Sequence, residues 1–140
     1  MNESVSGQPI AAPVAAYVGI DWADQKHDVV LRSVGDPAKA EHQVIKSEIN
    51  ALNDWIAQMH ECFAAKGRVL VCLEQSRGAL IYQLIAYELF ELYPINPSQL
   101  AHYRKTFFSS GAKDDRPDAD LLSELLMCHR DRLKAWNPDD

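Results

Sequence analysis

The alternation of apolar and polar residues predicts three strands at the start of the chain. An apolar run over residues 17–21 stops at the carboxylate of Asp21, which is typical of a strand buried on both faces. Residues 22–25 are polar enough to turn the chain, and residues 27–33 and 42–46 then return to strand-like character. Together these segments predict an antiparallel meander.

A helix and a buried strand follow the meander. Apolar residues recur at helical spacing over residues 49–63, between Ser47, a good N-cap, and Gly67, a glycine of the kind that ends helices. The nearly unbroken apolar run over residues 68–73 predicts a central strand that ends on Glu74. Because a helix separates this strand from the first one, a crossover connection should make the two strands parallel.

The remaining segments predict three more helices and one short strand. Residues 93–95 contain a proline and predict an edge strand. The first of these helices is expected over residues 76–91. The second should run from Pro97, which follows the N-cap Asn96, to about residue 108, and a loop is expected at 109–112. The third should begin near Pro117. The order predicts an α/β fold: a mixed sheet of three antiparallel strands and then parallel strands, flanked by helices.

Length and composition indicate one domain. The chain has 140 residues, of which 47% are apolar and 24% are charged, enough for one domain with a hydrophobic core. We expect a flexible leader over residues 1–16, the domain over residues 17–135, and a tail over residues 136–140 that could begin a linker to an absent carboxyl-terminal domain.

The cysteines and the hydropathy indicate a cytoplasmic protein without a membrane span. The three cysteines are far apart and lack the spacing of a zinc site or a disulfide framework, so we expect reduced core thiols at Cys62, Cys72 and Cys128. No run of apolar residues is long enough to cross a bilayer.

The charge distribution restricts how the chain could bind nucleic acid. A net charge of −6 excludes binding through bulk positive charge, so contact with phosphates needs a local basic patch or metal ions. Residues 99–116 are locally positive and contain interleaved aromatic residues. This segment predicts nucleic-acid contacts by Arg104, Lys105, Lys113 and Arg116. An ordinary solvated helix with its aromatic residues in the core is the alternative.

Acidic residues stand at three points that the predicted fold could bring together. Asp21 and Glu74 end parallel strands, so both should emerge at the sheet edge where α/β proteins bind ligands. Asp115 and Asp118 are three residues apart at the start of the last helix, and both could point to one place. The alternative is that the strand acids simply end in solvent and that Asp115 and Asp118 form a capping box.

Helical phase distinguishes the acids of the last helix. At about 100° per residue, Asp118 shares a face with the leucines at 121, 122 and 125, whereas Asp120 lies on the opposite side. We therefore expect Asp118 to need a partner and Asp120 to need none.

A set of converging carboxylates predicts metal ions. Four carboxylates in one place would repel one another unless cations lay between them. Oxygen ligands without histidine or cysteine suit Mg²⁺ or Mn²⁺. Two such ions about 4 Å apart would contact the attacking and leaving oxygens of a phosphodiester. The expected ligands of the two ions are Asp21, Glu74, Asp115 and Asp118.

The motifs resemble a known family. A first strand ending in G-I-D, with LEQSRGALIYQL, YPINPSQLAHYRK and SGAKDDRPDADLLSELL, is similar to the amino-terminal domain of the DEDD insertion-sequence transposases, which include the Piv invertases and the bridge-RNA-guided recombinases. The similarity covers about residues 17–135 and implies a ribonuclease-H-like, RuvC-like fold. It also implies that Asp21, Glu74, Asp115 and Asp118 are the family's four catalytic acids, and that Asp114 stands where members often have threonine.

The resemblance also implies partners. Members cut and rejoin DNA with a second, carboxyl-terminal domain that carries a serine nucleophile, and nothing in this sequence matches that domain. The implied function is metal-dependent DNA cleavage and strand transfer during transposition, by a larger protein of which this chain is one half. DNA and a guide RNA are the candidate partners, and an apolar surface left by the missing half would favour a homo-oligomer.

Three other functions fit parts of the pattern. A RuvC-type Holliday-junction resolvase would use the same acids without a second domain. A non-catalytic RNA- or DNA-binding and dimerisation module would keep the fold and not the chemistry. An actin-like nucleotide-binding domain shares the G-I-D strand, but no glycine-rich phosphate loop follows Asp21, so this function ranks last.

Overall fold

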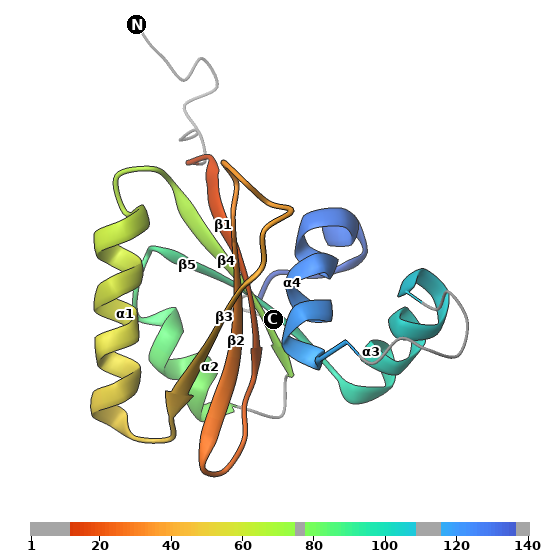
Figure 1. The fold of residues 1–140 in the computed structure, drawn as a ribbon, viewed down its shortest axis with the longest axis horizontal. Helices are drawn as coiled ribbons and strands as arrows, with labels where there is room; N and C mark the ends of the chain where they lie inside the picture. Colours follow the sequence, from red (N-terminus) through yellow and green to blue (C-terminus); the bar gives the residue numbers. More distant parts are fainter. Residues whose placement is uncertain (1–11, 75–77, 109–115, 137–140) are drawn as a thin grey trace, which may run out of the picture.

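A five-stranded mixed sheet forms the centre of the molecule, with the strand order β3-β2-β1-β4-β5 (Figure 1). The structure is a computed structural model and describes residues 12–74, 78–108 and 116–136. The strands are β1 (Val14–Asp21), β2 (Lys26–Ser33), β3 (Glu41–Lys46), β4 (Arg68–Glu74) and β5 (Phe90–Ile95). The helices are α1 (Ile49–Phe63), α2 (Gly78–Ile85), α3 (Pro97–Tyr103), which continues into a π-helical turn (Arg104–Phe108), and α4 (Asp118–His129), which a 3-10 turn (Arg130–Arg132) follows.

The strand pairing confirms the predicted topology. β1, β2 and β3 pair antiparallel in sequence order. β4 then pairs parallel with β1, and β5 pairs parallel with β4 at the edge of the sheet. A meander followed by parallel strands, with helices packed on the sheet, is the mixed α/β arrangement that the sequence predicts and is consistent with the ribonuclease-H-like fold that the resemblance implies.

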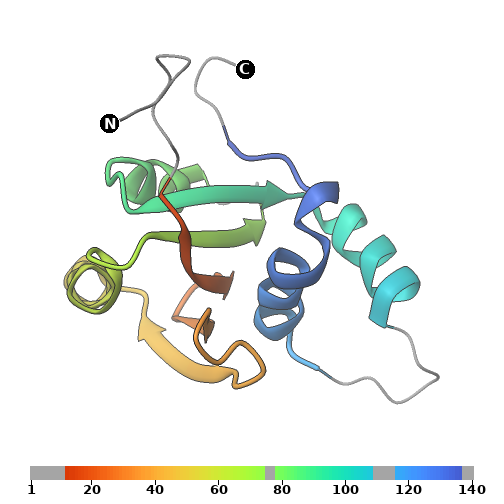
Figure 2. The same cartoon turned by 90° about the horizontal axis from the view of Figure 1, so that it is seen from above.

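Helices cover both faces of the sheet, so the described residues form three layers (Figure 2). Successive strand residues point to opposite faces, which gives two separate apolar cores. In β1, Val18 and Ile20 face α1 and α2, whereas Tyr17 faces α4. In β4, Val71 and Leu73 likewise face α1 and α2, and the alternating residues face α4. We call these two faces the α1 face and the α4 face.

α4 packs directly on the backbone of β1. A Cβ atom added at Gly19 would lie 2.0 Å from the carbonyl oxygen of Ala119 and 2.7 Å from the amide nitrogen of Ser123. Only a glycine permits this approach, because any side chain would collide with backbone atoms that cannot move aside. The contact brings the first turns of α4 against the carboxyl-terminal part of β1.

Several predicted boundaries differ from the structure. β1 begins at Val14, so residues 14–16 belong to the sheet and not to the predicted leader. The two alanines at 15 and 16 obscure this in the sequence, because alanine has a weak strand preference. α2 ends at Ile85, six residues earlier than predicted, because the chain turns there to begin β5 at Phe90.

The helix caps are partly as predicted. Asn96 caps α3 as expected: its Oδ1 accepts a hydrogen bond from the Gln99 amide (2.7 Å), and Gln99 Oε1 accepts one from the Asn96 amide (2.9 Å). The N-cap of α1 is Glu48, not Ser47, whose amide donates to the Gln25 carbonyl. The predicted loop at 109–112 lies outside the described residues.

The cysteines are free but not all in the core. Cys72 is buried against α4, and burial raises the pKa of its thiol, so it stays protonated. Cys62 and Cys128 are exposed, so the prediction of core thiols is wrong for these two. Both lie on outer faces of amphipathic helices, where spacing alone does not reveal exposure.

No helix within the described parts of the chain combines the length and apolar character needed to cross a membrane.

Candidate active site at the carboxyl edge of the sheet

Asp21 and Glu74 occupy equivalent positions on neighbouring parallel strands. Gly19 of β1 pairs with Cys72 of β4, and each acid comes two residues later on its strand. By strand alternation both acids continue the α4 face, and both are partly exposed. The two carboxylates therefore lie at the same edge and on the same face of the sheet, as the parallel pairing predicts.

Asp118 stands at the same edge, at the start of α4. Figure 1 shows α4 beginning beside the arrowheads of β1 and β4. Asp118 is the first residue of the helix after Pro117, and its neighbour Ala119 contacts Gly19. The Asp118 carboxylate accepts a hydrogen bond from Arg104 Nη2 at 2.5 Å. The third candidate acid is thus near the other two in the fold and is paired with a guanidinium group.

The donor chemistry of these acids fits a hard divalent cation. Carboxylate oxygens without histidine or cysteine suit Mg²⁺ and Mn²⁺. The fourth candidate, Asp115, lies outside the described residues, as do Asp114 and Lys113. Within the described ranges, no three acidic, histidine or cysteine side chains are grouped closely enough to hold a metal ion. Metal binding by Asp21, Glu74, Asp115 and Asp118 therefore stays a prediction.

Asp120 is paired and largely buried, so the prediction that it needs no partner is wrong. Its carboxylate accepts hydrogen bonds from Arg32 Nη2 (2.6 Å) and Arg116 Nε (3.1 Å), and its side chain is 14% exposed. Burial opposes ionisation, but the two arginines outweigh it and hold the pKa of the Asp120 carboxyl below its usual value. α4 packs across β1 onto β2, so its buried face is wider than the leucine stripe.

The predicted basic residues have mixed surroundings. Arg104 pairs with Asp118, and Arg116 pairs with Asp120 and Glu124, whereas Lys105 is exposed. Both arginines thus neutralise acids of α4. Nucleic-acid contacts by Arg104, Lys105, Lys113 and Arg116 stay a prediction.

The aromatic residues of the same segment contribute to packing. Tyr103 is buried and donates its hydroxyl hydrogen bond to the Arg132 carbonyl. Phe107 stacks on His129 with ring centroids 4.0 Å apart, and the Arg132 guanidinium lies over its ring. Tyr103 and Phe107 therefore pack against the core, as the alternative to nucleic-acid contact predicts for the aromatic residues of this segment.

Comparison with known proteins decides the family. Residues 18–140 match the family model of the IS110-type DEDD transposases, which is described as Transposase. The chain belongs to this family. It is 33% identical over 112 residues to y4uE of Sinorhizobium fredii, a protein named as a transposase. The matched region covers 79% of this chain and 31% of that protein. It is 32% identical over 117 residues to the mini-circle transposase for IS117 of Streptomyces coelicolor, covering 81% and 27%.

These matches confirm the resemblance carried by the sequence motifs. They also show that this transposase-family chain spans less than a third of the length of these two relatives.

The turn after Asp21 is held by a histidine to which the sequence assigns no role. In this transposase-family domain the Trp22 and His27 rings stack with centroids 3.4 Å apart, and His27 is buried. The Ala23 amide donates a hydrogen bond to His27 Nδ1 at 3.0 Å. Because the stack and the hydrogen bond fix the turn, they restrict the direction in which Asp21 leaves β1. An isolated histidine carries no spacing signal from which this could be read.

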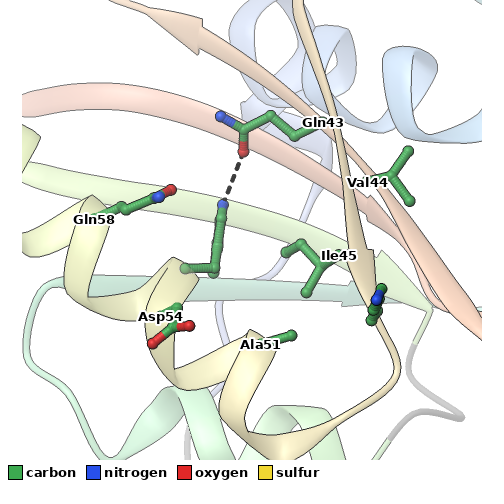
Figure 3. Close-up of a pocket in the computed structure, with 8 residues that line it drawn as sticks. Gln43, Val44, Ile45, Ala51, Asp54 and Gln58 are labelled. Atoms are coloured by element: carbon green, nitrogen blue, oxygen red, sulfur yellow. Dashed lines mark hydrogen bonds between the residues drawn. The ribbon is translucent and has the colours of Figure 1, made fainter.

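A cavity of about 390 Å³ lies between β3 and α1 of the transposase-family domain (Figure 3). Trp55 Nε1 donates a hydrogen bond to Gln43 Oε1 at 3.0 Å across it. Gln43 and Ile45 belong to the α1 face, whereas Asp21 and Glu74 belong to the α4 face. The cavity is therefore separate from the candidate acids.

Proposed function

We propose that this chain is the RuvC-like catalytic domain of an insertion-sequence DNA transposase. In this proposal its acids serve metal-dependent phosphodiester cleavage and strand transfer. Membership of the transposase family supports the general function. The observation that carries the proposal is the register of β1 and β4, which sets Asp21 and Glu74 side by side on the face covered by α4.

The proposed ligands are Asp21, Glu74, Asp115 and Asp118, with Mg²⁺ or Mn²⁺ as the cofactor and two ions in the site. Such ions would stabilise charge on the attacking and leaving oxygens of the phosphodiester. The contribution of the chain is to orient the carboxylates. Two of them extend from paired strands, and Asp118 begins a helix that Gly19 allows to lie against β1. Rigid elements hold ligands more precisely than loops do.

DNA is the proposed substrate, and it needs positive charge near an acidic site. We assign this role to Arg104, Lys105, Lys113 and Arg116. The exposed Lys105 supports the assignment, as does the position of Arg104 and Arg116 beside α4. Phosphate contacts of this kind position DNA without reading its sequence.

The complete protein is proposed to supply what this chain lacks. Because the chain spans less than a third of its relatives, cleavage and rejoining are expected of the full-length transposase and not of this part alone. Self-association and a guide RNA are further proposals for the complete protein. Light scattering with and without added RNA measures the mass of the complete protein. A monomeric mass would refute self-association, and a mass that added RNA does not change would refute the guide RNA.

Metal dependence is the experiment that tests the proposed function. The full-length transposase should cut DNA carrying its insertion-sequence end when Mg²⁺ is present, and a chelator should abolish the cleavage until Mg²⁺ or Mn²⁺ is restored. Gel analysis of end-labelled DNA measures the cut strand. Cleavage that persists at full rate in chelator would refute the metal site.

A second substrate separates the proposal from its nearest alternative. A RuvC-type resolvase would cut a four-way DNA junction without another domain, so this chain alone, supplied with Mg²⁺, should leave such a junction intact. Symmetric junction cleavage by the chain alone would favour the resolvase instead.

A further inference from the structure

Arg32 is a buried charge at the centre of a polar network under α4. It lies on β2 opposite Tyr17 of β1, on the α4 face, and is only 6% exposed. Its Nε donates a hydrogen bond to Ser123 Oγ (2.9 Å), its Nη2 to Asp120 Oδ1 (2.6 Å) and its Nη1 to the Pro37 carbonyl (2.9 Å). Each nitrogen of the guanidinium fork therefore has an acceptor, and the fork can adopt one orientation only.

The network continues from α4 to the chain that enters it. Asp120 uses its second carboxylate oxygen to accept from Arg116 Nε at 3.1 Å, and Arg116 Nη2 donates to Glu124 at 2.5 Å. Ser123 Oγ also donates to the Asp120 carbonyl at 2.7 Å. The first turns of α4 are thus tied to β2 on one side and to Arg116 on the other. We call Arg32, Arg116, Asp120, Ser123 and Glu124 the Arg32 network.

Two candidate ligands adjoin this network in the chain. Arg116 directly follows Asp115, and Asp118 lies between Arg116 and Asp120. Arg104 donates to the Arg116 carbonyl and to the Asp118 carboxylate. A change in the orientation of α4 would therefore move Asp118 relative to the strand acids.

The apolar contacts of α4 do not fix its orientation alone. The Gly19 contact sets how closely α4 approaches β1, but burial of leucine side chains is non-directional and does not by itself fix the rotation of the helix about that contact. Buried ion pairs often add little net stability compared with apolar residues of the same size. A guanidinium fork bound to a carboxylate, a hydroxyl and a carbonyl accepts little change in geometry.

We infer that Arg32 and Asp120 are positioning residues, which orient the start of α4 so that Asp118 meets Asp21 and Glu74 at the carboxyl edge of the sheet. The inference rests on the proposed function, because it assigns a purpose to the network only if Asp118 binds metal together with the strand acids. Neither residue is a metal ligand in this account. Both act through α4, as partners outside the ligand shell commonly do.

The test compares metal binding with stability in the 140-residue chain. The variants are Arg32→Met, which keeps most of the unbranched part of the side chain but removes the guanidinium group, and the isosteric Asp120→Asn. The control is Arg68→Met, which breaks the ion pair between Arg68 and Glu91. Arg68 begins β4 and therefore lies at the opposite end of that strand from Glu74. Calorimetry measures Mn²⁺ affinity at a temperature where circular dichroism finds every variant folded. Hydrogen exchange measures protection along α4.

The expected result is a selective effect. Arg32→Met and Asp120→Asn should weaken Mn²⁺ binding about tenfold or more, the loss typical of residues that orient metal ligands, and Arg68→Met by less than about twofold. The same two variants should lose exchange protection in the first turns of α4. Equal Mn²⁺ affinity in all four proteins would overturn the inference, even if the variants were less stable.

Failure of the proposed function would look different. If the wild-type chain bound no Mn²⁺, the metal part of the proposed function would fail for this chain. Hydrogen exchange would then decide whether the Arg32 network holds α4 in its orientation, which is the structural part of the inference. Loss of protection at α4 in Arg32→Met but not in Arg68→Met would support it, and unchanged protection in both would overturn it.

Discussion

The complete transposase carrying Asp21→Asn should lose DNA cleavage while its amino-terminal domain stays folded. Asparagine has the size of aspartate but lacks the negative charge that a divalent cation requires. Loss of one ligand should remove several kcal/mol of transition-state stabilisation, which lowers the cleavage rate about a thousandfold or more. Single-turnover cleavage of end-labelled DNA measures the rate, and circular dichroism measures the fold.

Asp24→Asn is the matched control for this experiment. Asp24 is exposed in the turn three residues after Asp21, so its replacement removes the same charge from the same region. Cleavage should change by less than about twofold, because Asp24 is exposed to solvent, which weakens its interaction with other charges, and is not a proposed ligand. Equal loss in both variants, or full activity in Asp21→Asn, would show that Asp21 has no special role.

Gly19→Ala should destabilise the domain by about 3 kcal/mol, at the upper end of the usual cost of overpacking. The new methyl group would lie 2.0 Å from the Ala119 carbonyl oxygen, so α4 would have to lift from β1. Because the obstacle is backbone, no rotamer change relieves it. Urea unfolding measures the loss of free energy, and Mn²⁺ affinity should fall with it because Asp118 moves with α4.

Gly35→Ala tests whether any glycine substitution has this effect. Gly35 lies in an exposed turn, and a Cβ atom there would have no heavy atom within 4 Å. Its replacement should change the free energy of unfolding by less than about 0.5 kcal/mol. If the Gly19→Ala and Gly35→Ala proteins had the same free energy of unfolding, α4 would not pack as closely on β1 as the structure describes.

The sequence predicts the fold best where one pattern decides an element. The apolar runs of β1 and β4, each ending on an acid, predict both strands, and the helix between β3 and β4 predicts that β4 runs parallel to β1. The asparagine and proline at 96 and 97 mark the start of α3 correctly. The end of α2 is missed because the turn before β5 contains no glycine or proline to mark it.

The candidate site is predictable to the extent that it depends on strand direction. Parallel pairing is enough to bring Asp21 and Glu74 to one edge. The buried role of Asp120 is not predictable in this way, because its partner Arg32 is 88 residues away in the chain. Helical phase describes one helix alone and does not tell how many strands the helix covers. The sequence around Gly19 likewise does not indicate that the backbone of α4 packs against this glycine.

Calorimetry tests whether the acids from separate parts of the chain converge on one metal site. Mn²⁺ titrated into the purified chain should bind, and Asp21→Asn should weaken the binding at least about tenfold, or about 1.4 kcal/mol. That result would mean that an acid at the end of β1 belongs to the metal site. Binding that is equally tight in wild type and Asp21→Asn would show that Asp21 lies outside any metal site, and the acids would then not converge.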